Sequence, residues 1–470
     1  MKTTAIFSNC RPATPSGLAA LFCAAALLPA LALCDDWQLP AELKDAVAAL
    51  EPAQQAFIVS GDARQFMPTR QIEHELATRP PAAMRQLVSD LMAVAAELGY
   101  EPERDMGAIP LNLTSRQFNA GFTTTPEPLR KIERTPGPFS VHRYLFTESG
   151  IPTFAGAKVA IYPEDLAAGN VDVAIIGIPS DMGSGRRDAG HGPLAMRGVN
   201  TIATPDVKTL LNPLDVLSVV DYGNFSVDYL STQRTIGHVT DMVAETAATG
   251  AVPMMVGGDT SMLYPGVAGV ARHHGHGSFG LVHFSAHPDV HRTAVHTMSD
   301  TQAVFRLIYE QVVDGRHLIQ VGLRGNDVTV ENLQWLREQG VRYHTMAAIE
   351  QHGYDAVLER VLDEVARGPD RLFVSIDVSV IEPTEMVAAG RIASHGLRVQ
   401  EVTRAIRRLC AEREIVGFEL TDMAPMLDYS RLSAMNANAV LNACLVGMAA
   451  RKAGLASDYI HPLALDHEQD

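Results

Sequence analysis

Short apolar runs alternate with longer amphipathic segments from about residue 150 onward. The runs are rich in Val, Ile and Leu, which is typical of strands buried on both faces, and the segments between them repeat apolar residues at helical spacing. We therefore predict one α/β domain over residues 150–470, a three-layer parallel sheet with helices on both faces. The predicted strands are 171–178, 215–223, 252–258, 279–285, 318–325, 371–377 and 414–420, and the predicted helices between them include 235–250, 301–313, 354–368 and 399–412.

The region before this domain has a different pattern. Apolar residues recur at helical spacing in 41–59 and 82–100, with a break at Arg79-Pro80-Pro81, whereas 101–150 is rich in Pro, Thr and Gly. We predict that residues 33–149 form an N-terminal helical extension followed by a linker or wrapping arm.

Residues 17–34 form an uncharged apolar run behind Lys2 and Arg11, and Ala30-Leu31-Ala32 supplies a small-residue cleavage pattern. We interpret residues 1–32 as a signal peptide, which predicts export to a periplasm or secretion. An uncleaved membrane anchor is the alternative, because the run is just long enough to span a bilayer.

The composition of the 470 residues, 47% hydrophobic and 20% charged, indicates a globular protein. Lys and Arg number 38 against 54 Asp and Glu, a formal charge of −16, so the chain offers no basic surface for nucleic acid or anionic lipid. Cationic ligands remain compatible with this charge, as does mere solubility.

Five cysteines occur in the chain. Cys10 and Cys23 would leave with the signal peptide, and Cys34 lies next to the cut. Cys410 and Cys444 each fall in a helical pattern; they could form a disulfide, but we favour two buried small hydrophobic side chains. The absence of a CxxC pair excludes a cysteine zinc site.

Polar clusters follow four of the predicted strands. They are Gly257–Ser261, Ser285–Asp289, Ser375–Ser379 and Thr421-Asp422. Ligand sites of parallel sheets lie at the carboxyl ends of the strands, so these clusters are expected to meet. Their carboxylates and one imidazole would suit a divalent metal ion such as Mn²⁺.

At these residues the sequence resembles the ureohydrolase family of arginases, agmatinases and guanidinobutyrases. GGDTS stands for the family's GGDHS, SAHPD for DAHxD, and SIDVSVIEP for SxDxDxxDP, while Gly150-Ile151-Pro152-Thr153-Phe154 and Gly177-Ile178-Pro179-Ser180-Asp181 match its earlier pattern. The resemblance covers about Gly150 to the C-terminus. It implies an arginase-like fold and the hydrolysis of linear amidines, in which a guanidino compound gives urea and an amine.

The resemblance also implies two Mn²⁺ ions held by six side chains, with a bridging hydroxide that attacks the guanidinium carbon. Carried over by motif, the ligand positions are Thr260, Ser285, His287, Asp289, Asp377 and Ser379. Thr260, Ser285 and Ser379 are degenerate, because neutral hydroxyls are poor ligands for a divalent ion. His287, Asp289 and Asp377 could hold one ion, completed by water or by His283, His291 or Glu382; alternatively the remnants bond to one another in a metal-free pocket.

Two further positions match residues that contact substrate in the family. His296 lies where a proton-relaying histidine is found, and Asp422 stands where a glutamate pairs with the substrate guanidinium. Asp422 could instead cap a strand-end loop. We interpret His273-His274-Gly275-His276 as a solvated loop rather than a metal tract, and we reject Ser285, His287 and Asp289 as a hydrolytic triad, since alternate positions of a strand stand in a row.

We favour an exported, agmatinase-like protein that is catalytically silent and acts as a partner subunit, in a homo-oligomer or with an intact homologue. The alternative is an active hydrolase with an altered or mononuclear metal site and a small guanidino-type substrate. Loss of three ligands directly weakens metal binding, whereas a retained pocket allows activity but does not demonstrate it.

Overall fold

A computed structural model describes residues 39–98, 135–141, 150–184, 188–199, 205–292 and 298–465. The predicted signal peptide, residues 1–32, lies outside the described residues. Contacts divide the chain into two compact units, Met1–Ser89 and Asp90–Asp470. Each is described by itself.

The N-terminal region is helical, as predicted. Pro52 and Pro81 each occupy the first turn of a helix, where a missing N–H costs nothing, and Gln54 and Glu51 form a capping box at the first of them. The helices of this region are α1 (Lys44–Ala48), α2 (Pro52–Val59), α3 (Thr69–Thr78) and α4 (Pro81–Leu98). Farther along, Phe139 pairs with Val159 through two backbone hydrogen bonds, so part of the predicted linker lies along an edge of the sheet.

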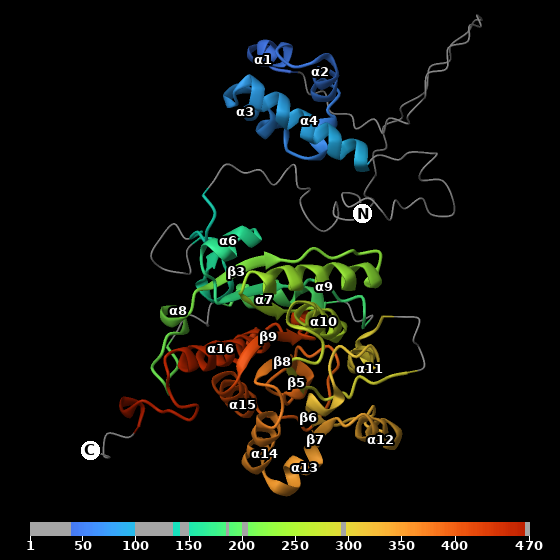
Figure 1. The fold of residues 1–470 in the computed structure, drawn as a ribbon, viewed down its shortest axis with the longest axis vertical. Coiled ribbons are helices and arrows are strands. Elements are labelled where there is room, and N and C mark those ends of the chain that lie inside the picture. The colour runs from blue at the N-terminus through green and yellow to red at the C-terminus, as the bar shows by residue number, and fades with distance from the viewer. Residues whose placement is uncertain are drawn as a thin grey trace, which may run out of the picture. The chain divides into compact units, whose positions relative to one another are not determined.

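The α/β domain is built on a parallel sheet, which confirms the predicted fold class (Figure 1). The nine strands lie in the order β1-β3-β2-β4-β9-β8-β5-β6-β7. Their bounds are β1 Lys158–Val159, β2 Val173–Gly177, β3 Val219–Asn224, β4 Val252–Val256, β5 Gly280–Phe284, β6 Leu318–Leu323, β7 Arg342–Thr345, β8 Arg371–Asp377 and β9 Glu414–Thr421. Strands β1 and β7 were not predicted, because edge strands so short and polar lack an apolar run.

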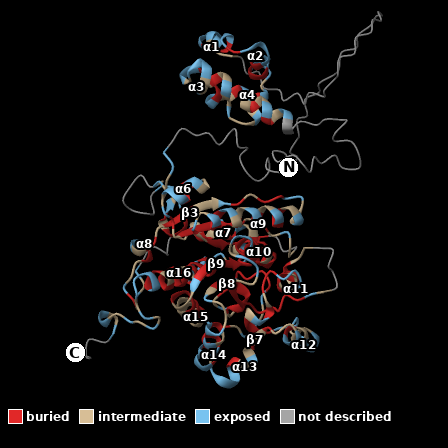
Figure 2. Ribbon diagram, viewed as in Figure 1, coloured by how far each residue is buried: buried red, intermediate tan, exposed pale blue. Residues whose placement is uncertain are grey.

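The strands β2, β4, β5, β6, β8 and β9 send side chains into two main cores, one on each face of the sheet. Val173 and Ile175 of β2 belong to one core, while its Ile176 belongs to the other. The first core is covered by α13 (Met346–His352), α14 (Tyr354–Ala366), α15 (Val399–Glu412) and α16 (Leu432–Lys452). The second is covered by α9 (Thr232–Ala248), α10 (Leu263–His274), α11 (Ala303–Tyr309) and α12 (Val330–Glu338). Figure 2 shows the buried strands between these layers.

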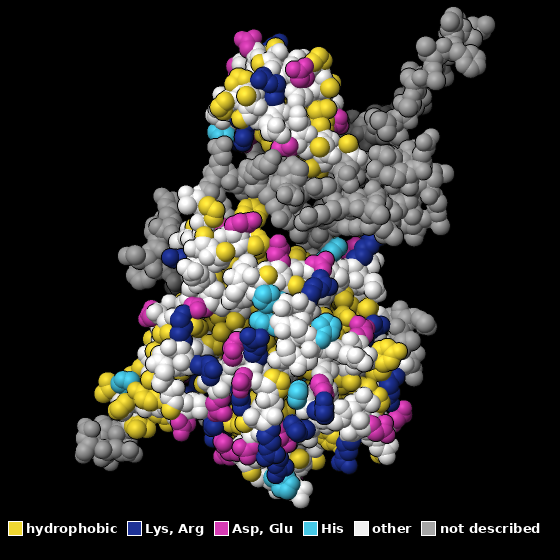
Figure 3. Space-filling view, viewed as in Figure 1, with side chains coloured by type: hydrophobic (Ala, Val, Ile, Leu, Met, Phe, Trp, Pro, Cys, Tyr) yellow, Lys and Arg dark blue, Asp and Glu magenta, His cyan; other side chains and the backbone are white. Residues whose placement is uncertain are grey.

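The described residues of this domain also include three shorter α-helices. Their bounds are α6 Pro163–Ala168, α7 Gly192–Arg197 and α8 Pro213–Val216. On the face drawn in Figure 3, acidic and basic side chains are intermixed over this domain.

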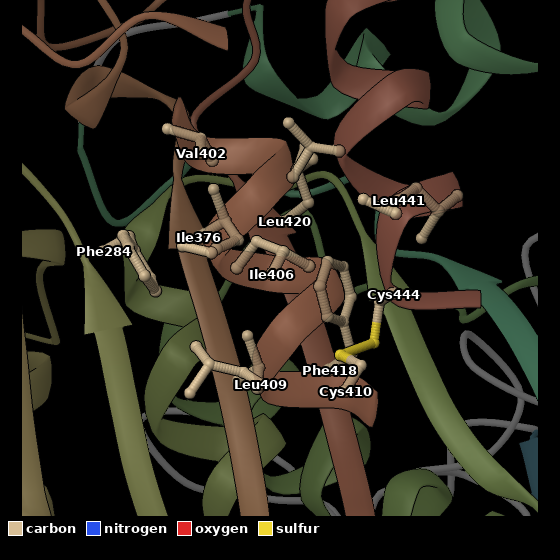
Figure 4. Close-up of a cluster of buried hydrophobic side chains, with 14 of the residues drawn as sticks. Phe284, Ile376, Val402, Ile406, Leu409, Cys410, Phe418, Leu420, Leu441 and Cys444 are labelled. Atoms are coloured by element: carbon tan, nitrogen blue, oxygen red, sulfur yellow. A yellow bond between two sulfur atoms is a disulfide. The ribbon is translucent and has the colours of Figure 1, made fainter. Parts of the chain in front are cut away.

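A disulfide between Cys410 of α15 and Cys444 of α16 cross-links the first core (Figure 4). Our preference for two unbonded thiols was therefore wrong: both residues are fully buried, but their Cα atoms are only 5.2 Å apart. Gly447 allows the approach, because a Cβ there would lie 2.5 Å from the carbonyl oxygen of Arg407. Sequence periodicity could place each cysteine on a buried helix face but could not give the distance between the two helices.

Helix α16 is long and apolar enough to cross a membrane by length and composition, and among the described helices it alone meets that test. Of its most apolar window, 67% is buried within the domain. Because α16 packs on α15 and β9, we interpret it as a core helix.

Candidate active site

Four strand ends that are neighbours in the sheet bring the predicted polar clusters together. Strands β4, β9, β8 and β5 lie in that order and run parallel, so their carboxyl ends share one edge. The side chains of Thr260 and Ser285 both reach Asp377, which is 117 and 92 residues away in the sequence. The predicted convergence at one site is thus present in the structure.

The three degenerate ligand positions donate hydrogen bonds to Asp377, one of the two carboxylates that remain. Thr260 Oγ1 donates to Asp377 Oδ2 at 2.9 Å, and Ser285 Oγ donates to the same oxygen at 3.3 Å. The backbone N–H of Ser379 donates to Asp377 Oδ1 at 2.8 Å. All four residues are buried.

Arg391 fills the centre of the site with its guanidinium group. Its Nη1 lies 2.7 Å from Asp289 Oδ1, and its Nη2 lies 2.9 Å from Asp377 Oδ2 and 3.3 Å from Asp289 Oδ2. Its Nε approaches Asp300 Oδ2 at 3.2 Å, an ion-pair distance without hydrogen-bond geometry. Only 7% of the Arg391 side chain is exposed, so one buried cation bridges three carboxylates.

This guanidinium keeps the two central carboxylates ionised. Burial alone would raise the pKa of both Asp289 and Asp377, but the charge of Arg391, added to the hydrogen bonds and smaller charges around each carboxylate, outweighs it. The pKa of Asp289 falls to about 2, and that of Asp377 is also lowered. Conversely, burial would lower the pKa of Arg391, yet the neighbouring carboxylates hold it well above its ordinary value.

Two other acids at the site, Asp300 and Asp422, have raised pKa values. Burial raises the pKa of Asp300 to about 6, although the nearby guanidinium of Arg391 opposes the rise. Burial, reinforced by the charge of Asp377, holds the pKa of Asp422 well above its usual range. The Oδ2 atom of Asp422 accepts a hydrogen bond of 2.7 Å from the backbone N–H of Arg391. The site therefore contains Asp422, as predicted, but its neutral form is favoured and it anchors the Arg391 backbone.

Asp422 and Gly390 lie unusually close. A Cβ at Gly390 would meet the Oδ1 atom of Asp422 at 2.4 Å, so glycine at this position lets the Arg391 segment reach the strand end. Asp289 and Asp422 both have left-handed backbones, with φ of 51° and 69°. Such conformations in residues other than glycine are costly and concentrate at functional sites.

The two ring nitrogens of His287 contact Asp327 and the Arg391 backbone and form no hydrogen bond with Asp289 or Asp377. Its Nδ1 lies 3.0 Å from Asp327 Oδ2, and its Nε2 lies 3.0 Å from the backbone oxygen of Arg391. Neither nitrogen is hydrogen-bonded to Ser285 Oγ or to Asp289, while Ser285 Oγ donates to Asp377. The structure thus gives no Ser-His-Asp relay from these residues, in agreement with their rejection as a triad.

A buried polar row lies behind the carboxylates. His283 Nδ1 contacts Ser375 Oγ at 2.8 Å, and that hydroxyl donates to Glu419 Oε1 at 2.7 Å. Burial raises the pKa of Glu419 to about 8. His283 Nε2 is 3.6 Å from Asp289 Oδ2. His283 and Ser375 were named from the sequence, but their connection to Glu419 was not predicted, because Glu419 sits inside a strand that otherwise looks apolar.

The other candidate ligands lie apart from the carboxylates. Glu382 accepts a hydrogen bond from the backbone of Gly396, and His291 is exposed. His296 is outside the described residues. Over the parts of the chain that the structure describes, no group of three or more His, Cys, Asp or Glu side chains could hold a metal ion, and this includes His273, His274 and His276.

Arg391 is the functional residue that sequence reasoning missed. It is a single charge in the otherwise apolar or small stretch Met386–Ala393, which follows the SIDVSVIEP motif. That isolated charge beside a strand-end motif was the available signal. The sequence alone cannot show that Arg391 pairs with Asp289 and Asp377, because these residues lie on different loops.

The side chains present do not fit the Mn²⁺ ions that the resemblance implies. Asp377 Oδ2 already accepts hydrogen bonds from Thr260, Ser285 and Arg391, which fully engages that oxygen, and Oδ1 accepts one from the backbone N–H of Ser379. Asp289 is engaged by both terminal nitrogens of Arg391. A divalent ion between these two carboxylates would coincide with the guanidinium.

Comparisons with known proteins agree with the geometry of the fold. Residues 171–447 match the arginase family. The chain is 28% identical over 276 residues to the mitochondrial agmatinase of Gallus gallus, covering 58% of this chain and 80% of that one. It is 26% identical over 282 residues to a guanidinobutyrase of Pseudomonas aeruginosa, covering 59% of this chain and 86% of that one.

A solved structure, the proclavaminate amidino hydrolase from Streptomyces clavuligerus, superposes with a TM-score of 0.59 at 24% identity. The match covers 65% of this chain and 99% of that one. At this identity the likeness concerns the fold.

Proposed function

The chain belongs to the arginase family, and from that premise we propose that it is an agmatinase-like member that does not hydrolyse guanidino compounds, because its own Arg391 takes the place of the metal ions. The observation that carries the proposal is the buried guanidinium between Asp289 and Asp377. A hydrolytic member needs a metal-activated hydroxide at that point. Here the cation is an arginine, which cannot lower the pKa of a coordinated water.

Charge balance supports this assignment. In the family, the four positive charges of two Mn²⁺ ions are matched by several carboxylates, whereas here two of those carboxylate positions are the neutral side chains of Ser285 and Ser379. The two central carboxylates are paired with one guanidinium. The site has lost both negative charge, through fewer carboxylates, and positive charge, through one guanidinium in place of two divalent ions. Such matched losses are expected of a site that has become a structural ion cluster.

The proposed role is that of a partner subunit in a homo-oligomer or with an intact homologue. A groove of about 520 Å³ beside the end of β9 supports it. Its lining includes Leu194, Met426 and Tyr429, whose side chains are exposed by 68%, 65% and 93%. Apolar side chains gathered in this way are typical of interaction surfaces.

Export is part of the same proposal. The apolar leader at residues 17–34 supports it. A buried disulfide between Cys410 and Cys444 agrees with it, because structural disulfides persist in oxidising compartments and are rare in the cytosol.

Metal analysis and urea release test the proposal directly. Purified protein is incubated with Mn²⁺, passed over a desalting column and analysed for metal, and then assayed with agmatine, arginine and 4-guanidinobutyrate. We expect no stoichiometric metal and no urea. Stoichiometric Mn²⁺ with turnover would establish the alternative, an active hydrolase with an altered or mononuclear site.

A set of substitutions separates the role of Arg391 from that of the lost ligands. The variant with Thr260→His, Ser285→Asp and Ser379→Asp restores the ligand types and should still bind no Mn²⁺, because the guanidinium remains. Adding Arg391→Ala to this set should create Mn²⁺ binding. Binding by the first variant, without the change at Arg391, would contradict the proposed replacement.

A further inference from the structure

Helices α15 and α16 pack side by side (Figure 1). A second concave site lies between them and the loop that contains Lys208. Its volume is about 400 Å³. Lys208, Arg404 and Arg407 line it together with Asn442 and Asp206. It is separate from the Arg391 cluster, with which it shares no lining residue.

The cations of this pocket are short of partners. The side chains of Lys208 and Arg407 form no ion pair or hydrogen bond with any residue in the described part of the chain, whereas Arg404 pairs with Asp355 at 2.7 Å. Most other basic side chains near α15 are paired: Arg408, for example, contacts Glu359 and Glu412. On a chain of net charge −16, two unpaired cations facing one hollow stand out.

Burial and mutual repulsion make these cations costly. Partial burial, with help from the charges of Arg407 and Arg404, lowers the pKa of Lys208. Burial is also the main cause that lowers the pKa of Arg407, and the charges of Arg408 and Arg404 add to it. The charge of an anion bound among them would offset the mutual repulsion and favour the charged forms of Lys208 and Arg407.

The pocket also has an acceptor and a negative wall. The Oδ1 atom of Asn442 is buried without a hydrogen-bond partner in the described structure. Asp206 uses its Oδ1 atom to accept from the backbone N–H groups of Lys208 and Thr209, and its charge acts on both Lys208 and Arg407. An anion that also carries a proton donor suits this arrangement, since it can satisfy the cations and the free amide oxygen together.

We infer that this pocket binds a small phosphate, either the inorganic ion or the phosphoryl group of a monoester. Hydrogen phosphate presents charged oxygens to Lys208 and Arg407 and an O–H group to Asn442. Arg404 adds a third cation at the wall. This binding site goes beyond the role proposed for the Arg391 cluster and does not depend on it.

Titration of the full chain with inorganic phosphate tests the inference. Isothermal calorimetry in a chloride buffer should show one phosphate per chain with a dissociation constant of about 1 mM or tighter. Glycerol 3-phosphate is titrated in parallel; tighter binding of the ester identifies the phosphorylated compound as the ligand, and tighter binding of the ion identifies inorganic phosphate. Lack of saturable binding of both would overturn the inference.

Variants locate the site. Lys208→Gln and Arg407→Gln should each weaken phosphate binding about tenfold or more, while Arg316→Gln, at an exposed arginine paired with Asp314, should leave it unchanged. Asp206→Asn should tighten binding, because it removes a negative charge and keeps an acceptor for the loop. Equal affinity in the Lys208 and Arg407 variants, with folding confirmed by circular dichroism, would place phosphate elsewhere and refute the inference.

Discussion

Replacing Arg391 by Met removes the cation of the central ion cluster and keeps most of the side-chain volume. Asp289 and Asp377 are both fully buried and would lose their charge partner. Removing one partner of a buried ion pair costs about 3–5 kcal/mol, because the remaining charge is left without compensation. At roughly 2 °C per kcal/mol for a domain of this size, the melting temperature should fall by about 6–10 °C.

The pH dependence of this loss has a definite sign. In the wild type the folded pKa of Asp289, about 2, lies below its unfolded value, so its stabilising contribution is present above about pH 4 and is lost as the pH falls toward 2. In the variant the buried carboxylates lack the cation, so burial should raise their folded pKa values above the unfolded ones. The variant should therefore lose stability as the pH rises, and its deficit should be smaller at pH 5 than at pH 8.

Thermal melts at both pH values measure the effect, with circular dichroism at low temperature to confirm the fold. Arg316→Met is the matched control, since Arg316 is 75% exposed and pairs with Asp314 on the surface; its melting temperature should stay within about 1 °C of the wild type. A shift for Arg391→Met of less than about 2 °C at pH 8 would show that the guanidinium does not hold the site together.

Other substitutions test the surrounding structure. Cys410→Ala should destabilise by about 2–4 kcal/mol in denaturant titration under oxidising conditions, because a crosslink spanning 34 residues is lost, and a reductant should remove most of the difference from wild type. Glu419→Gln should flatten the dependence of stability on pH between pH 5 and 8. In the wild type the folded pKa of Glu419, about 8, lies above the unfolded one, so its contribution to stability falls by up to about 1.4 kcal/mol for each pH unit of rise. An unchanged slope in the variant would argue against a buried neutral acid at this position. Gly447→Ala should lower the free energy of unfolding, because the new Cβ would meet the Arg407 carbonyl oxygen at 2.5 Å. Gly237→Ala, within α9, is the control: its Cβ would meet nothing within 4 Å, so it should raise the free energy of unfolding by about 0.5–1 kcal/mol. Equal effects of the two substitutions would refute the close approach of α15 and α16.

Much of the fold could be predicted from the sequence because the central strands are continuous apolar runs. Strands β2, β4 and β8 each coincide with such a run, and the carboxyl ends of β4, β5, β8 and β9 had to share an edge once the sheet was parallel. The positions of Thr260, Ser285 and Asp377 at one site followed from that arrangement. Strand β7, with the sequence RYHT, has no such run and takes its conformation from pairing with β6.

The rest depended on distances between segments. Arg391 lies on a loop that returns to the strand ends, and nothing local in Gly390-Arg391 specifies that its side chain meets Asp289, 102 residues earlier. The Cys410–Cys444 bond likewise depends on the separation of two helices. Sequence patterns indicated which residues are buried, whereas pairing across the core had to come from the three-dimensional structure.

A cation that is covalently part of the chain differs from a bound ion in how it is supplied. The backbone of Arg391 follows Gly390 and is hydrogen-bonded to Asp422. The effective concentration of its guanidinium at the carboxylates is therefore fixed by the polypeptide and not by the solution. With Arg391 in place of the metal ions, folding of this domain is independent of metal supply, and chelators should leave its melting temperature unchanged. A protein built in this way enters a manganese-poor environment with its central carboxylates already paired with a cation.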